Sequence, residues 1–302
     1  MTAAASPAIP DAPPPRSVAV VGLGLIGASL LGALRQALPE VDRIAVGRRA
    51  ETAERAVADG LATRAGTDAA VLRRAEVVVL CTPVDAMPAW LEAAASAAPR
   101  AVLTDAGSTK AWVTGRAIEL LGPGRFVGGH PMAGRERSGY DAAEPSLFAG
   151  ATWILTPSGA AEAELIAPWA AAVTSIGARV EALDPAAHDA AVALISHLPF
   201  ALSAALVRAA GADPSWEAAW RLASSGFRDT ARLAGGDPAM YAAITSTNAR
   251  PLTEALDAFE RQITLLRGVI DDRAAAADYF GAAQRTRADW LRRREGSGRP
   301  VL

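Results

Sequence analysis

The stretch SVAVVGLGLIGAS, residues 17–29, decides the fold of the first part of the chain. It opens with five apolar or small residues, three of them β-branched, which predict a short buried strand. The glycines that follow have the spacing GxGxxG and lead into an Ala- and Leu-rich helical pattern. Gly22 would make the tight turn, Gly24 would let the backbone approach a pyrophosphate, and Gly27 would let the helix lie close to the strand. Helix N-terminal amides would then face the phosphates. The residues expected to contact a dinucleotide here are Gly22, Gly24, Leu25, Ile26 and Gly27.

A second strand is expected at residues 43–46, and its end bears on the choice of cofactor. In NAD-binding proteins an acidic residue at this point holds the ribose 2′-hydroxyl. This chain has Gly47, Arg48 and Arg49 instead. A glycine followed by two guanidinium groups leaves room for a 2′-phosphate and supplies donors that match it, which favours NADP over NAD. The alternative is that both arginines are solvated and the 2′-hydroxyl is held by backbone or water.

The alternation of strands and helices continues to about residue 183. It predicts an α/β fold class, a Rossmann-type parallel sheet with helices on both faces. Ligands of such sheets bind beyond the carboxyl ends of the strands, so Thr82, Pro83 and Asp105 are expected at the cofactor mouth. Ser108 is either a helix N-cap or a hydrogen-bond partner of the nicotinamide or of a catalytic imidazole. Further strands are expected at 77–80, 101–104, 125–127, 152–155 and 178–183, and helices at 50–59 and 87–97.

The segment GGHPMAGRERSG, residues 128–139, is the best candidate for chemistry. His130 titrates near neutral pH and can accept a proton during a reaction. The flanking glycines and Pro131 favour a sharply bent loop, which the preceding strand would deliver to the ligand edge of the sheet beside Ser108. The alternative is a surface loop with a satisfied histidine.

From Asp184 onward the sequence pattern is helical. Asp184 and Pro185 form an N-cap with proline at the first helical position, and Pro199 is expected to kink the helix that contains His197 or to free a carbonyl in it. The amphipathic segment 251–269 suggests burial against a second subunit, so we expect a helical dimerisation domain and a homodimer. The expected divisions are a disordered lead-in at 1–15, a dinucleotide-binding domain at 16–183, a helical domain at 184–294 and a flexible tail at 295–302.

Composition narrows the classes of protein to which the chain can belong. Its 302 residues are 51% hydrophobic and 21% charged, enough for a large core. The net charge of −2 lacks the basic excess of nucleic-acid-binding proteins. The single cysteine, Cys81, excludes an internal disulfide and suits a reducing compartment. No apolar run reaches the length of a membrane span. We therefore expect a cytoplasmic protein with a small-molecule substrate, and no metal, membrane or nucleic-acid partner.

Six motifs in order, GLGLIGAS, DAGSTK, GGHPMAGRERSG, SHLPF, GFRDTARLA and DPAMY, resemble the prephenate and arogenate dehydrogenases of tyrosine biosynthesis. The resemblance covers residues 17–272. It implies a Rossmann domain joined to a helical dimerisation domain, and oxidative decarboxylation of a cyclohexadienyl substrate with NAD or NADP. By this resemblance His130 accepts the proton of the C4 hydroxyl, Ser108 holds His130 and the nicotinamide in register, and Arg232 binds the ring carboxylate.

Further substrate-site residues follow from the same resemblance. Glu136 and Asp229 would shape the pocket and its ion pairs, and Tyr241 would close the site of the neighbouring subunit. His197 is a candidate substrate contact, although a core histidine is the alternative. Phe200 stands where many relatives have a second histidine, so contacts to the substrate side chain can differ.

Three hypotheses remain open from the sequence. The first is a prephenate or arogenate dehydrogenase, whose two substrates differ by a keto or an amino group. The second keeps the fold and cofactor but changes the substrate, as in an imine or β-hydroxyacid reductase, and His130 counts against it because those reactions favour a lysine or tyrosine proton donor. The third is a non-catalytic NADP-sensing dimer, in which replacing His130 has no effect.

Overall fold

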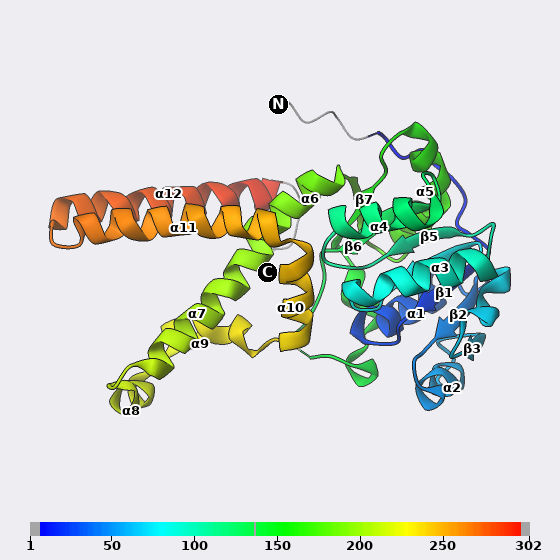
Figure 1. Cartoon of the computed structure of the whole chain (residues 1–302), viewed down its shortest axis with the longest axis horizontal. Coiled ribbons are helices and arrows are strands. Elements are labelled where there is room, and N and C mark those ends of the chain that lie inside the picture. The colour runs from blue at the N-terminus through cyan, green and yellow to red at the C-terminus, as the bar shows by residue number, and fades with distance from the viewer. Residues whose placement is uncertain (1–6, 136, 297–302) are drawn as a thin grey trace. The chain divides into compact units, whose positions relative to one another are not determined.

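The structure, a computed structural model, describes residues 7–135 and 137–296. An eight-stranded sheet with the order β3-β2-β1-β4-β5-β6-β7-β8 forms the first part of the chain (Figure 1). The β6–β7 pair is antiparallel and the other neighbouring pairs are parallel. The strands are β1 (Ser17–Val21), β2 (Asp42–Val46), β3 (Arg64–Gly66), β4 (Val77–Leu80), β5 (Val102–Asp105), β6 (Phe126–Pro131), β7 (Thr152–Thr156) and β8 (Arg179–Ala182).

This strand order confirms the predicted α/β fold class. The chain moves outward from β1 to β3, then returns to pair β4 with the other side of β1. The segment after β1 therefore leads to one side of the sheet and the segment after β4 leads to the other. In folds of this kind the ligand crevice lies at the carboxyl ends of these two strands. The sequence prediction missed β3, because three half-buried residues carry too little periodicity to be recognised.

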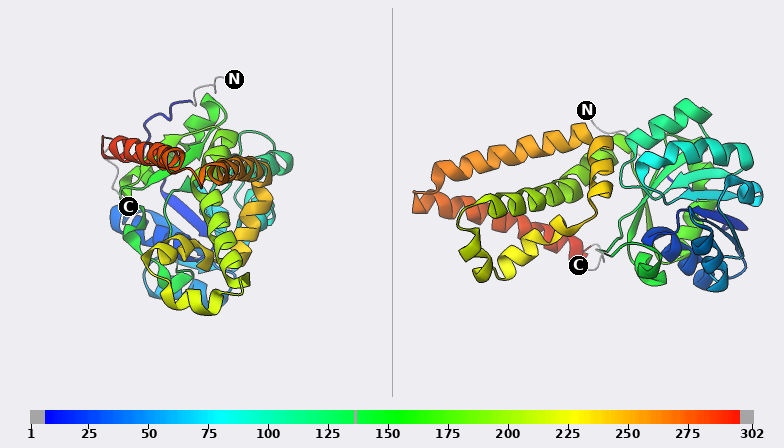
Figure 2. Two further views of the ribbon diagram at one scale, coloured as in Figure 1. Left: turned by 90° about the vertical axis from the view of Figure 1, so that its left-hand side faces the viewer. Right: turned by 60° about the horizontal axis from the view of Figure 1, so that its bottom comes forward.

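Helices cover both faces of the sheet, and β1 shows why. All five of its residues are buried: Val18 and Val20 belong to one apolar core, while Ala19 and Val21 belong to the core on the opposite face. Figure 2 shows the helices coloured cyan and those coloured blue on opposite sides of the strands. One core includes residues of α1 (Leu25–Ala37), α2 (Ala50–Ala58) and α5 (Ala160–Ser175), and the other includes residues of η1 (Ala69–Arg74), α3 (Met87–Ala97) and α4 (Ala111–Leu121).

The segment at 7–15, predicted to be a disordered lead-in, has no helix or strand. It nevertheless packs Ile9 against the core that contains α5. Pro15, two residues before β1, is buried. This apolar contact ties the segment to the sheet.

A continuous helix runs from Pro185 to Ala212 and comprises α6 (Pro185–Val192), the π-helical turn η5 (Ala193–His197) and α7 (Leu198–Ala212). The predicted cap is confirmed, because Oδ1 of Asp184 accepts hydrogen bonds from two amides of the first turn at 2.9 and 3.0 Å. The irregularity expected from Pro199 takes the form of the wide turn just before it, since proline has no amide hydrogen to donate.

This helix also corrects an expectation about apolar length. The helix is 28 residues long and contains an 18-residue stretch with a mean hydropathy of 2.0, which makes it long and apolar enough to cross a bilayer, whereas no such segment was expected from the sequence. Length and composition are the only basis for that statement. The helix also carries His188 and Asp189, whose buried polar side chains bond to one another.

The chain forms two compact units, one ending at Ala249 and one beginning at Arg250. In the second unit the chain turns after α11 and α12 runs back in the opposite direction (Figure 1), so a further long helix follows the amphipathic 251–269 segment. The remaining helices and turns are η2 (Val84–Ala86), η3 (Tyr140–Ala142), η4 (Pro145–Phe148), α8 (Trp216–Ala219), η6 (Trp220–Leu222), α9 (Ser225–Ala231), η7 (Arg232–Gly235), α10 (Pro238–Thr247), α11 (Ala249–Val269) and α12 (Arg273–Gly296).

Candidate active site

The glycine turn between β1 and α1 has the geometry that a dinucleotide needs. Gly22 has a φ of +102°, and a Cβ at this position would lie 2.7 Å from the carbonyl oxygen of Cys81. A Cβ on Gly27 would lie 1.9 Å from the oxygen of Gly22, so the close approach of helix and strand requires glycine. Gly24 caps α1 without a side-chain bond and has no described atom within 4 Å of its Cβ direction. Leu25 and Ile26 begin α1, and their amides are open to an anion, so this turn fits a pyrophosphate.

The predicted ribose end of the site is at the end of β2. Gly47 is buried and donates its amide hydrogen to the carbonyl of Gly66 over 3.1 Å. Arg48 and Arg49 follow with exposed side chains, and Arg49 occupies the N-cap position of α2. The two guanidinium groups are thus at the sheet edge where the cofactor ribose is expected, and both are free of steric restraint by the core.

The other predicted cofactor residues divide into two kinds. Thr82 is half-buried, and its Oγ1 is a buried atom without a hydrogen-bond partner among the described residues. Pro83 is exposed at the same edge. Asp105 does not fit a direct cofactor contact, because its side chain is fully buried and its oxygens accept hydrogen bonds from protein groups. Its partners are the amides of Gly107 and Gly129 and the ammonium group of Lys110.

The glycines before His130 serve close packing and not a bend. The prediction of a sharply bent loop is wrong at 128–131, because these residues are the extended end of β6. A Cβ on Gly128 would lie 2.6 Å from Oγ1 of Thr156, and a Cβ on Gly129 would lie 2.5 Å from the carbonyl oxygen of Asp105. Glycine allows β6 to lie this close to its neighbours, and His130 projects from a regular strand as a result.

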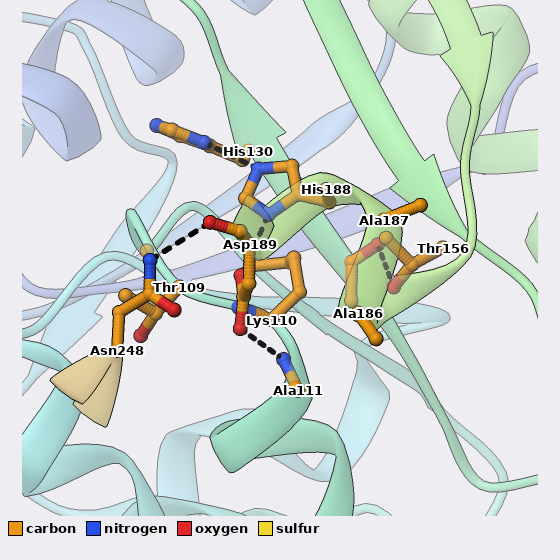
Figure 3. A network of polar contacts seen from close by, with 12 residues as sticks. Thr109, Lys110, Ala111, His130, Thr156, Ala186, Ala187, His188, Asp189 and Asn248 are labelled. Atoms are coloured by element: carbon orange, nitrogen blue, oxygen red, sulfur yellow. Dashed lines mark hydrogen bonds and ion pairs between the residues drawn. The ribbon is translucent and has the colours of Figure 1, made fainter. Parts of the chain in front are cut away.

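His130 belongs to a chain of hydrogen bonds that the sequence analysis did not foresee (Figure 3). Its Nδ1 lies 2.9 Å from Nε2 of His188, and Nδ1 of His188 lies 2.8 Å from Oδ1 of Asp189. A carboxylate can only accept, so Nδ1 of His188 is the donor. With its own hydrogen on Nδ1, His188 presents Nε2 as the acceptor of the hydrogen on Nδ1 of His130. This order leaves Nε2 of His130 with a lone pair that can take a proton.

Asp189 anchors this chain to the sheet domain. Its Oδ1 and Oδ2 accept the amide hydrogens of Lys110 and Ala111 over 2.7 and 2.8 Å, which caps the N-terminus of α4 from another helix. The predicted N-cap role of Ser108 is therefore wrong. Ser108 lies half-buried in the loop between β5 and α4. Its contact with His130 stays a prediction, and Nδ1 of that imidazole is already taken.

The ring of His130 is held in its neutral form. Burial is the main cause that lowers the pKa of His130 well below 6.5, and the coulombic effects of His188, Lys110 and His197 add to it. His130 itself is only partly buried, so a substrate can reach the ring. At neutral pH the imidazole is thus ready to accept a proton.

His197 is placed in the core alternative that the sequence left open. It is 1% exposed, its Nδ1 lies 3.0 Å from Nδ2 of Asn248, and its Nε2 has no partner among the described residues. Burial lowers the pKa of His197 to about 4. The same Asn248 donates to the backbone oxygen of Asp189 over 2.9 Å, so all three histidines of the chain are connected through one polar network.

Of the substrate residues predicted in the helical domain, Arg232 and Tyr241 lie near one another, whereas Asp229 pairs with Arg228. α9 ends at Ala231, so Arg232 begins the next turn, η7, and the Asp229 carboxylate accepts a hydrogen bond from Arg228 over 2.9 Å on an exposed surface. Arg232 lies near Tyr241, since its charge lowers the pKa that burial of the phenol raises. Glu136 lies outside the described residues.

Phe200 and Tyr241 form an aromatic pair. Their ring centroids are 4.0 Å apart with an interplanar angle of 8°, and the Tyr241 hydroxyl donates to the carbonyl of Leu233 over 2.8 Å. Phe200 is buried. The departure at Phe200 therefore supplies an apolar surface where a second histidine would supply a hydrogen-bonding group.

Four residues of the site were missed by the sequence analysis, namely Lys110, His188, Asp189 and Asn248. His188 and Asp189 follow an Asp-Pro cap in an Ala-rich helix, where their spacing resembles ordinary helix polarity. The one available signal was the rarity of histidine, which occurs three times in the chain. Among the described residues, no three His, Cys, Asp or Glu side chains are grouped as a metal site.

Comparison with known proteins gives a consistent result. A family model described as prephenate dehydrogenase, nucleotide-binding domain, matches residues 30–182, and one described as prephenate dehydrogenase, dimerization domain, matches residues 184–282. Prephenate dehydrogenase of Bacillus subtilis (strain 168) is 32% identical over 265 residues, which are 86% of this chain and 71% of the relative.

Two solved structures resemble the chain over most of its length. Synechocystis arogenate dehydrogenase has a TM-score of 0.79 and 36% identity, covering 91% of this chain and 99% of that one. Prephenate dehydrogenase from A. aeolicus, in complex with hydroxyphenyl propionate and NAD+, has a TM-score of 0.84 and 27% identity, covering 91% and 98%.

Proposed function

The chain belongs to the prephenate dehydrogenase family, and from this premise we propose that it catalyses the NAD(P)-dependent oxidative decarboxylation of prephenate to 4-hydroxyphenylpyruvate in tyrosine biosynthesis. Arogenate, which gives tyrosine directly, is the alternative substrate. One observation carries the proposal: a neutral imidazole with an open Nε2 lies at the end of a strand that shares its sheet edge with the glycine turn.

The reaction asks little of the protein beyond alignment and removal of one proton. Nε2 of His130 accepts the proton of the C4 hydroxyl while the covalent bond between C4 of the substrate and its hydrogen breaks. A bound nicotinamide would accept the hydride that leaves C4 of the substrate. Loss of carbon dioxide makes the ring aromatic, so no poor leaving group has to be stabilised. Ser108, at the same edge, is proposed to hold His130 and the nicotinamide in register.

Arg232 is proposed to bind the ring carboxylate, because a guanidinium fork suits a carboxylate. We expect Arg232→Ala to raise KM for the cyclohexadienyl substrate by about 10- to 100-fold, the worth of one or two charge-assisted hydrogen bonds, with a smaller change in kcat. Steady-state kinetics measures both. Arg228→Ala is the matched control, since Arg228 is exposed and bonds Asp229 at the surface. An unchanged KM for Arg232→Ala would make Arg232 structural.

NADP is the proposed preferred cofactor, which the exposed Arg48 and Arg49 support. We expect the double variant Arg48→Ser/Arg49→Ser to raise KM for NADP+ by about 10- to 100-fold and KM for NAD+ by less than about threefold, because only the 2′-phosphate requires both donors. Arg100→Ser is the control, since Arg100 is exposed before β5 at the opposite edge of the sheet. Equal changes for both cofactors would assign the arginines to general phosphate attraction.

The deciding experiment is reduction of NAD+ and of NADP+ by the purified protein, each with prephenate and with arogenate, followed by absorbance. Turnover in any of the four mixtures supports the proposed function, and the best mixture identifies substrate and cofactor. Cofactor binding without turnover in all four would instead support the non-catalytic sensing dimer.

The protein is proposed to be a cytoplasmic homodimer. The match to a dimerization domain supports a homodimer. We propose a cytoplasmic location for it, which the single cysteine and the biosynthetic reaction support.

A further inference from the structure

Lys110 contacts both groups that hold His130 in place. One is the backbone of Gly129, directly before His130, and the other is the carboxylate of Asp189, which bonds the ring partner His188. Its side chain is fully buried, forms an ion pair with Asp105 and donates from Nζ to the carbonyl oxygen of Gly129 over 2.7 Å. Its backbone amide donates to Oδ1 of Asp189 over 2.7 Å. We propose that Lys110 is a positioning residue for His130, holding the imidazole through both its backbone and its ring partner and keeping it in the proton-accepting form. This inference rests on the proposed function of His130 as the base.

The backbone support acts through the peptide before His130. Gly129 donates its amide hydrogen to Oδ1 of Asp105 over 2.9 Å, and its carbonyl accepts from Lys110. The residue is therefore held on both sides by one buried ion pair. Rotation of this peptide, which would turn the His130 side chain away from the site, has to break one of these two charge-assisted bonds.

The ring support acts through Asp189. Its carboxylate orients His188, which in turn bonds Nδ1 of His130. The same carboxylate is fixed by the amides of Lys110 and Ala111 at the start of α4. Figure 3 shows these groups in one cluster, with Asp189 between the histidines and the start of α4. A shift of Lys110 would displace both supports together.

The charge of Lys110 acts on the protonation of His130. Burial disfavours the imidazolium first, and coulombic effects, among them that of the Lys110 ammonium group, lower the pKa of His130 further. Asp105 and Asp189 are the acidic groups of the cluster, and both act to keep Lys110 charged against the cost of its own burial. A neutral side chain at this position would hold no such charge beside the imidazole.

The test uses the histidine NMR signals, because the chain contains three histidines and each can be assigned by single His→Asn variants. We expect Lys110→Gln, and the double variant Asp105→Asn/Lys110→Gln that leaves no unpaired charge, to raise the pKa of His130 by about 0.5 unit or more. Arg43→Met is the matched control. Arg43 is also a buried cation that donates to carbonyls, those of Leu61 and Val41, but it lies on β2.

Kinetics supplies the second readout. In both Lys110 variants the acid limb of kcat/KM should move to higher pH by the same amount as the NMR titration, and kcat at its plateau should fall by about tenfold or more, with KM for the cofactor unchanged. A merely structural lysine would lower the amount of active protein without moving the limb. If a folded variant keeps the wild-type titration of His130, the inference is overturned whatever its activity.

The two failures can be told apart. One outcome is that the wild-type protein shows no turnover while substitution of Lys110 still raises the pKa of His130 in the NMR titration. That outcome would refute the base role of His130 and with it the kinetic role of Lys110. Should neither variant fold, the wild type decides. A slowly exchanging ammonium signal for Lys110 together with a His130 pKa lowered from the ordinary 6.5 supports the inference, and a solvent-exchanged ammonium or an ordinary histidine pKa overturns it.

Discussion

His130→Asn is expected to lower kcat by about 10²- to 10⁴-fold, the usual contribution of a general base. The asparagine amide is close in size to the imidazole and can still bond Nε2 of His188, so β6 and the network behind it should persist. It has no group that accepts a proton at neutral pH. The loss should therefore appear in kcat, while the Kd of the oxidised cofactor, measured by fluorescence titration, stays within about threefold because the glycine turn is untouched.

The pH profile gives this prediction a second check. Since the pKa of His130 lies below its ordinary value of 6.5, the base form dominates at pH 7 and is lost only as the pH falls through the lowered value. Wild-type kcat/KM should have an acid limb below pH 6.5, and His130→Asn should lack it. A variant that keeps kcat within threefold of wild type would remove His130 from the chemistry.

Gly129→Ala is expected to destabilise the protein strongly. Its Cβ would lie 2.5 Å from the backbone oxygen of Asp105 and 3.1 Å from both Oγ1 of Thr104 and Nε1 of Trp153. The β5 backbone cannot move without separating β5 from β6, and the indole, on β7, is fully buried. Overpacking of this kind costs about 1–3 kcal/mol, and we expect the upper end or more, because the obstacle is main chain. Activity should fall with it, since His130 follows directly.

Gly134→Ala is the matched control within the same motif. No described atom lies within 4 Å of the Cβ direction of Gly134, so its free energy of unfolding should change by less than about 0.5 kcal/mol. Thermal or urea denaturation compares the two variants. Equal stability of Gly129→Ala and Gly134→Ala would mean that the close approach of β5 and β6 can relax at little cost.

The parts of the fold that depend on local pattern could be predicted from the sequence. The turn at Gly22 to Gly27 and the cap at Asp184 rest on backbone geometry and nearby hydrogen bonds, and such features leave a signature within a few residues. His130 could be singled out for the same reason, because few sequence contexts frame a histidine with glycines.

The rest of the site depends on contacts between distant segments. His188 and Asp189 are 58 and 79 residues away from their partners His130 and Lys110, and nothing in their own helix marks them. The glycines before His130 misled for a related reason. Glycine serves both for turns and for close packing, and only the tertiary neighbours of Gly128 and Gly129 decide between them.

The π-helical turn at Ala193–His197 has a consequence for how this helix tolerates length changes. An α-helix advances about 100° per residue, so eight regular residues would leave Asp189 and His197 about 80° apart around the axis. The underwound turn removes much of this angle and brings both within reach of Asn248. A one-residue deletion inside the turn would leave a more regular helix, yet it would rotate α7 relative to α6. The π-helical turn therefore sets the rotation of α7 relative to α6 about the helix axis. A change in the length of one helix would alter which side chains of the other face Asn248.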